Sequence, residues 1–200
     1  RVVFEGSVGS LPACVAFAEE LILRARAHPS KATLISALRM ASFAFRRNGD
    51  YDRARDLLTE SGDLAEKLGF AFARFRSYDA LAGVALEYGY FDRAHESILA
   101  AEAHFTPLFG PFFRASLDLN WMYWSIGMDH WVDARNRVDR IGPLDLSIRS
   151  HHHLLQAAAK LRVQMHDGRD EEARAILRAL VGYRDSVFRH GSVDQIAVAV

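Results

Sequence analysis

Apolar residues recur along the chain at spacings of three and four, the period of a helix that is buried on one side. Over residues 31–47, for example, Leu34, Leu38, Ala41 and Phe45 fall on one face. No stretch alternates apolar and polar residues with a period of two, so we predict essentially no strand. Helices are expected over about 10–27, 31–47, 51–68, 70–88, 92–105, 112–126, 130–141, 147–165 and 171–189, with another beginning near 192.

Residues that start and stop helices stand at the ends of these stretches. Ser10, Ser30 and Asp50 are suited to cap the helices that follow them, and Gly69 suits the left-handed residue after a helix. Two prolines flank apolar residues in the stretch 106–111, which we interpret as an ordered turn.

One segment of the chain is repeated. The stretch 48–58 returns at 88–98, more loosely at 131–138, and again at 167–177; its marker alanines Ala54, Ala94, Ala134 and Ala173 are 40, 40 and 39 residues apart. Such a period, with a glycine turn before a helix, predicts a solenoid of helical hairpins. In the third copy Gly127 stands seven residues before the alanine instead of five, which predicts a longer turn or a shifted register.

The repeats resemble tetratricopeptide repeats. The turn glycine, aromatic residue and packing alanine of that family match Gly49, Tyr51 and Ala54; two further copies match through Gly89, Phe91, Ala94, Gly168 and Ala173. The period of about 40 looks most like the long arrays of bacterial signalling ATPases and LuxR-type or maltose-activator-type regulators. The resemblance implies an all-α, right-handed superhelical α-solenoid that forms one domain over 1–200. Its expected parts are the second helix of a partial repeat at 10–28, repeats at about 30–69, 70–106, 111–142 and 147–190, and a truncated helix at 192–200, all part of a larger protein.

Composition narrows the classes of partner. The chain has 25 basic and 25 acidic residues, so no global field attracts nucleic acid or an anionic membrane. It has no apolar run of the roughly 18 residues that span a bilayer and no signal-peptide pattern, which favours a cytoplasmic protein. Cys14, the single cysteine, excludes an internal disulfide; we expect it to be buried where helices pack.

In such an array the first helix of each pair lines the concave side. That geometry predicts a groove for a partner protein, an extended peptide or a small effector, lined by Arg39, Phe43, Arg46, Arg76, Asp79, Arg114, Asp118, Trp121 and Trp124. The alternative is that the arginines are solvated and the tryptophans lie in the core. Arg39 and Arg76 are 37 residues apart, nearly in phase, and could form one anion-binding stripe.

The sequence contains none of the common motifs for catalysis, phosphate binding or metal binding. Consecutive histidines on a helix point about 100° apart, so the run 151–153, even with His166, is not expected to bind a metal. No phosphate loop, zinc-ligand spacing or nucleophile elbow is present, and we expect no enzyme and no cofactor. The leading hypothesis is a regulatory protein-interaction module without direct nucleic-acid or membrane binding; the alternative is a sensor of a small-molecule or peptide effector. The apolar end at 196–200 makes a homodimer conceivable.

Overall fold

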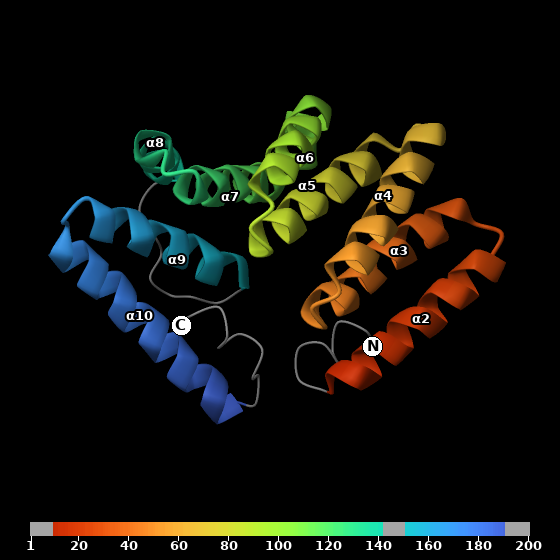
Figure 1. The fold of residues 1–200 in the computed structure, drawn as a ribbon, viewed down its shortest axis with the longest axis horizontal. Helices are drawn as coiled ribbons and strands as arrows, with labels where there is room; N and C mark the ends of the chain where they lie inside the picture. Colours follow the sequence, from red (N-terminus) through yellow and green to blue (C-terminus); the bar gives the residue numbers. More distant parts are fainter. Residues whose placement is uncertain (1–9, 142–150, 191–200) are drawn as a thin grey trace. The chain divides into compact units, whose positions relative to one another are not determined.

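A computed structural model describes residues 10–141 and 151–190 of the chain. Within these ranges it contains α-helices, one short 3-10 helix and no strand (Figure 1). The elements are α2 (Leu11–Ala27), α3 (Lys31–Arg47), α4 (Tyr51–Lys67), α5 (Ala71–Glu87), α6 (Phe91–His104), η1 (Pro107–Phe109), α7 (Pro111–Gly127), α8 (Trp131–Ile141), α9 (His151–His166) and α10 (Asp170–His190). The prediction of an all-helical chain is confirmed over the described residues. The helix expected at 192–200 lies outside them.

Side chains at the expected positions begin the first three helices. The Ser10 hydroxyl accepts the N–H of Ala13 at 3.4 Å, and the Ser30 hydroxyl accepts that of Thr33 at 3.3 Å. A carboxylate oxygen of Asp50 accepts the N–H of Arg53 at 3.0 Å. Each bond satisfies one of the backbone donors that a helix N-terminus leaves without a partner, so all three predicted caps are confirmed.

Five turns between helices are closed by the same backbone hydrogen bond. In the first, the Asp50 N–H donates to the Phe45 carbonyl at 2.9 Å, the six-residue closure of a Schellman motif. The other four N–H donors are Phe70, Tyr90, His130 and Arg169, with distances of 2.7 to 2.9 Å. The residue before each donor has a positive φ, and in four of the five turns it is a glycine: Gly49, Gly69, Gly89 and Gly168.

The turn of the third repeat is the exception in sequence but not in geometry. Its positive-φ residue is Asp129, with φ of 62°, and it stands five residues before Ala134, as the glycines do before their alanines. Gly127 is instead the last residue of α7. The expectation of a longer turn or a shifted register was therefore wrong. Asp is one of the few side chains that tolerate the left-handed region, so it can take the place of the glycine without changing the length of the turn.

The chain separates into two compact units, and the boundary falls within α7, between Leu117 and Asp118. In the first unit each helix from α2 to α5 packs on the next one along the chain, and α3 also contacts α5. Side chains of α2, α3, α4 and α5 form one continuous core, in which Cys14, Ala54 and Leu58 are fully buried. The predicted burial of Cys14 is confirmed.

The second unit is built in the same way. Met122 of α7, Ala134 and Val138 of α8, and Val163 of α9 share one core, and Leu154 of α9 packs with Leu180 of α10 in another. All four marker alanines of the repeat are buried, because a small side chain lets neighbouring helices approach closely. The packing of each helix pair on the next is consistent with an α-solenoid; that the repeats form one folding domain stays a prediction.

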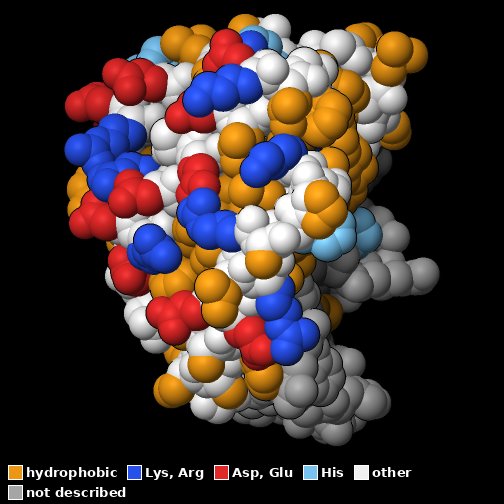
Figure 2. All heavy atoms as spheres, turned by 90° about the vertical axis from the view of Figure 1, so that its right-hand side faces the viewer, with side chains coloured by type: hydrophobic (Ala, Val, Ile, Leu, Met, Phe, Trp, Pro, Cys, Tyr) orange, Lys and Arg blue, Asp and Glu red, His pale blue; other side chains and the backbone are white. Residues whose placement is uncertain are grey.

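Charged side chains of both signs alternate around apolar patches on the face seen in Figure 2. Many of them pair locally, as Arg24 does with Glu20 within α2, or between helices, as Arg26 does with Glu60. Among the helices that the structure describes, none combines the length and the apolar character needed to cross a bilayer.

Candidate binding surface on the first helices

The first unit brings Arg39 of α3 and Arg76 of α5 close together. Burial lowers the pKa of the Arg39 guanidinium, and the positive charge of Arg76 lowers it further. Both effects disfavour a bare cation, because the charge loses water and faces a like charge. Among the described residues no carboxylate forms an ion pair with Arg39. Arg39 is thus a partly buried cation whose charge the described part of the chain leaves uncompensated.

Arg76, by contrast, is held in place by its own helix. Its Nη1 lies 3.0 Å from Oδ2 of Asp79, and the Ser116 hydroxyl of α7 donates to the same oxygen at 3.0 Å. Asp79 is buried, with 5% of its surface exposed. The Arg76 guanidinium also lies over the Phe113 ring, with its Cζ 4.8 Å from the ring centroid, a cation–π contact. Asp79 therefore acts as a support for Arg76 rather than as a group that faces a ligand.

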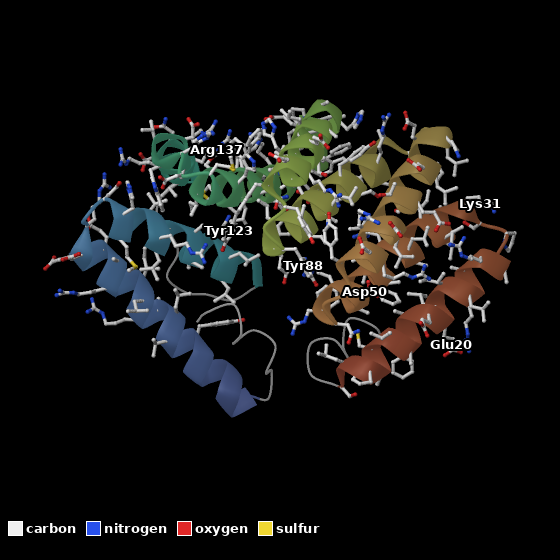
Figure 3. The ribbon with its side chains drawn as sticks, viewed as in Figure 1. Glu20, Lys31, Asp50, Tyr88, Tyr123 and Arg137 are labelled. Carbon is white, nitrogen blue, oxygen red and sulfur yellow. The ribbon has the colours of Figure 1, made fainter. Side chains whose placement is uncertain are left out.

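Arg46 and Phe43 lie further along α3. The Arg46 Nε is 3.3 Å from Glu87 Oε2, and its Cζ lies 5.3 Å from the Phe43 ring centroid. The Tyr88 hydroxyl donates to the Arg46 carbonyl at 3.0 Å, which ties the end of α5 to the end of α3, beside the turn that carries Asp50 (Figure 3). Burial raises the pKa of Tyr88. These contacts place Arg46 beside a carboxylate and join the two repeats, although its buried Nε has no hydrogen-bond partner within the described part of the chain.

Arg114 is the last predicted groove residue of the first unit. Its Nη1 lies 3.5 Å from Glu102 Oε1 of α6, and its Cζ is 5.7 Å from the Phe105 ring centroid. The charge of this arginine is paired, as that of Arg46 is. Within the first unit the structure thus gathers Arg39, Arg76 and Asp79 into one cluster, and it engages Arg46 and Arg114 with glutamates.

The remaining predicted residues, Asp118, Trp121 and Trp124, are described with the second unit. There Arg137 of α8 reaches Asp118 at 3.4 Å, and its Cζ lies over Trp121, 4.7 Å from the ring centroid. Trp121 is 8% exposed and meets Trp124 edge to face with ring centroids 5.6 Å apart. Trp124 is half-buried. This cluster packs α7 against α8 within that unit, and Arg137, which the sequence did not single out, sits at its centre (Figure 3).

Another cluster in the second unit joins α8 to the end of α9 and the turn that follows it. Arg135 donates two hydrogen bonds to the Asp167 carboxylate, one of them, from Nε, at 2.6 Å. These bonds lower the pKa of Asp167 from 3.8 to about 2. His166 stacks on Trp131 with centroids 3.9 Å apart, and its Nδ1 is 3.3 Å from Asp167. No sequence pattern predicted this cluster, because its members come from two repeats and meet only through helix packing.

Sequence reasoning also missed a group of exposed aromatic residues in the first unit. Phe72 of α5 contacts Phe109 of η1 and Phe113 of α7, with ring centroids 5.0 and 4.9 Å apart. Phe112 contacts Phe113 at 5.2 Å. Phe72 and Phe112 are 44% and 55% exposed. The density of phenylalanine over 105–113, beside a proline break, was the available signal.

Among the described side chains, no group of three or more His, Cys, Asp or Glu residues could hold a metal ion. The side chains of His151 and His152 lie outside the described part of the chain, so the interpretation of the histidine run stays a prediction.

Comparisons with known proteins add no further assignment. No protein-family model matches the chain, and no curated protein sequence is significantly similar to it.

Proposed function

We propose that the chain is a non-catalytic protein-interaction module, a right-handed tetratricopeptide-like solenoid of a cytoplasmic bacterial signalling or transcription regulator. In this proposal the face formed by α3 and α5 binds an anionic segment of a partner protein or peptide. The observation that carries it is Arg39, a partly buried cation beside Arg76 for which the described residues supply no carboxylate. A carboxylate from a partner would relieve the repulsion between the two arginines and form charge-assisted hydrogen bonds with a guanidinium.

The arrangement also favours binding over structural pairing. Structural arginines of the same unit have an acidic partner, such as Glu60 for Arg26 and Glu87 for Arg46. Asp79, which could have served both arginines, is bonded to Arg76 and Ser116. An arginine that folding leaves in this state costs stability, since its charge is desolvated without compensation. A ligand that supplies the missing charge offsets that cost.

The test uses a fluorescein-labelled pentaglutamate peptide, with pentaglutamine as the neutral reference, in fluorescence anisotropy at low salt. Arg39→Gln should weaken pentaglutamate binding by about tenfold, the loss expected for one charge-assisted contact. Arg24→Gln on α2 is the matched control, because it removes the same charge from a residue that is paired with Glu20; it should change the affinity by less than about twofold. Equal losses for the two variants would mean that only net charge attracts the peptide, and would refute the proposal.

A sensor of a small anionic effector is the second candidate, because the same pair of arginines could bind a free carboxylate or phosphate compound. A rise in melting temperature with citrate or inorganic phosphate, abolished by Arg39→Gln, would favour the sensor. Pentaglutamate binding without such a rise would favour the interaction module.

A further inference from the structure

The cation cluster and the exposed aromatic residues are parts of one connected surface. Arg76 lies over Phe113, and Phe113 contacts Phe72, which in turn contacts Phe109. Each contact is between side chains of α5, η1 and the first turn of α7, all within the first unit. We call the side chains of Phe72, Phe109, Phe112, Phe113 and Leu108 the aromatic surface.

Exposure of the aromatic surface is large for a water-soluble fold. Leu108, at the centre of η1, is 95% exposed, and Phe112 is more than half exposed. Contiguous exposed apolar side chains bordered by charged groups are a feature of binding surfaces. The buried Phe75 contacts Phe105, Phe109 and Phe113 from below, so the exposed rings rest on a fixed support.

The aromatic surface is bordered by Arg76, and Arg76 lies near the uncompensated charge of Arg39. Arg76 is the link: its guanidinium covers one edge of the aromatic surface, and its charge acts on Arg39. The Cζ of Arg76 is 4.8 Å from the Phe113 centroid, and that centroid is 4.9 Å from the one of Phe72. The Phe72 ring thus lies within about 10 Å of the Arg76 guanidinium, a distance that roughly three residues of extended chain span.

We infer that this surface binds an extended peptide segment in which an acidic residue and a large apolar residue stand about three positions apart. The carboxylate binds the pair of Arg39 and Arg76, with the spacing taken from the Arg76 guanidinium, and the apolar side chain packs on Phe72 and Phe112. This inference rests on the proposed function for its acidic half, and it adds the apolar half and the spacing. Charge complementarity with the two arginines selects an acidic segment of a partner protein.

The experiment compares two labelled peptides that differ at one position: pentaglutamate followed by Gly-Gly-Trp-Gly, and the same peptide with Ser in place of Trp. The Trp peptide should bind the unmodified protein about tenfold more tightly, as expected for burying a large aromatic side chain. In Phe72→Ser/Phe112→Ser the gain should fall to less than about twofold, while the Ser peptide binds as before. In Leu99→Ser, which removes an exposed apolar residue from α6, the gain should remain. Circular dichroism establishes that each variant is folded, and Phe112→Ser alone replaces the double variant if that one unfolds.

Each of four results would overturn the inference. If the two peptides bind with equal affinity and their binding still depends on Arg39, the proposed function stands but the aromatic surface does not bind the apolar residue. A Trp gain that survives in the phenylalanine variants, or that is unchanged with eight glycines before the Trp, places the contact elsewhere. Phe112-dependent sedimentation with phosphatidylserine vesicles, together with no Trp gain, assigns the surface to a lipid bilayer. If neither peptide depends on Arg39, the proposed function itself fails.

Discussion

The same substitution, glycine to alanine, should change the stability of the first unit in opposite directions at two positions. Gly89 has a φ of +75°, and a Cβ added there would meet no atom within 4 Å. An alanine there therefore adds backbone strain but no clash. The strain of a left-handed residue costs about 1–2 kcal/mol, and the more restricted unfolded chain offsets about 0.4–1 kcal/mol of that cost. Gly89→Ala should lower the free energy of unfolding by about 1 kcal/mol.

Gly62 stands in the middle of α4, and an added Cβ would lie 3.5 Å from the Cβ of Ser77, an ordinary contact. Alanine is favoured over glycine in a helix interior by about 1 kcal/mol. Gly62→Ala should raise the free energy of unfolding by up to that amount, so the two variants should differ by about 2 kcal/mol.

Urea unfolding followed by circular dichroism at 222 nm measures the difference. With a slope of about 2 kcal/mol per molar urea, the midpoints of the two variants should be separated by about 1 M, with the unmodified protein between them. A midpoint for Gly89→Ala equal to or above that of Gly62→Ala would show that the Schellman turns do not set the repeat geometry as argued here.

Two further predictions concern the cores and the ion pairs. Phe75→Ala, at a fully buried ring, should lower the free energy of unfolding by about 3–5 kcal/mol, whereas Phe112→Ala at an exposed ring should cost less than about 1 kcal/mol; similar losses in urea unfolding would contradict the assignment of core and surface. Because Arg135 lowers the pKa of Asp167 to about 2, the pair stabilises the fold above the unfolded-state value near 3.8 and that contribution is lost as the pH falls toward 2. Thermal melts should show a weaker pH dependence between pH 4 and 2 in Asp167→Asn than in the unmodified protein, and identical slopes would argue against the pair.

Local sequence signals were sufficient for the helices because helix formation depends on neighbours along the chain. Ser10, Ser30 and Asp50 cap helices through backbone atoms three residues away. Because both partners lie in the same short stretch of sequence, such caps can be predicted from the sequence alone. The glycine turns were equally readable, since only a residue that tolerates positive φ fits there. Asp129 shows the limit: Asp is common at many other positions, so its role in the third turn is visible only from its backbone angle.

The candidate site was also predictable from the sequence only in part. The spacing of Arg39 and Arg76 predicted that they share a face, and the structure brings them together because α3 and α5 are equivalent helices of successive repeats that contact each other. The sequence could not tell which arginines would be paired. Arg46 meets Glu87 and Arg114 meets Glu102 across repeats, and such pairs depend on rotation and distance between helices.

The sequence by itself determined the helical repeat, its period of about 40 residues and the turns that separate its helices, because these follow from local backbone preferences and one-sided burial. Only the tertiary structure decided which charges are compensated and which rings stay exposed. Those properties arise where side chains of different helices meet, and contact between segments far apart in the chain is fixed by packing.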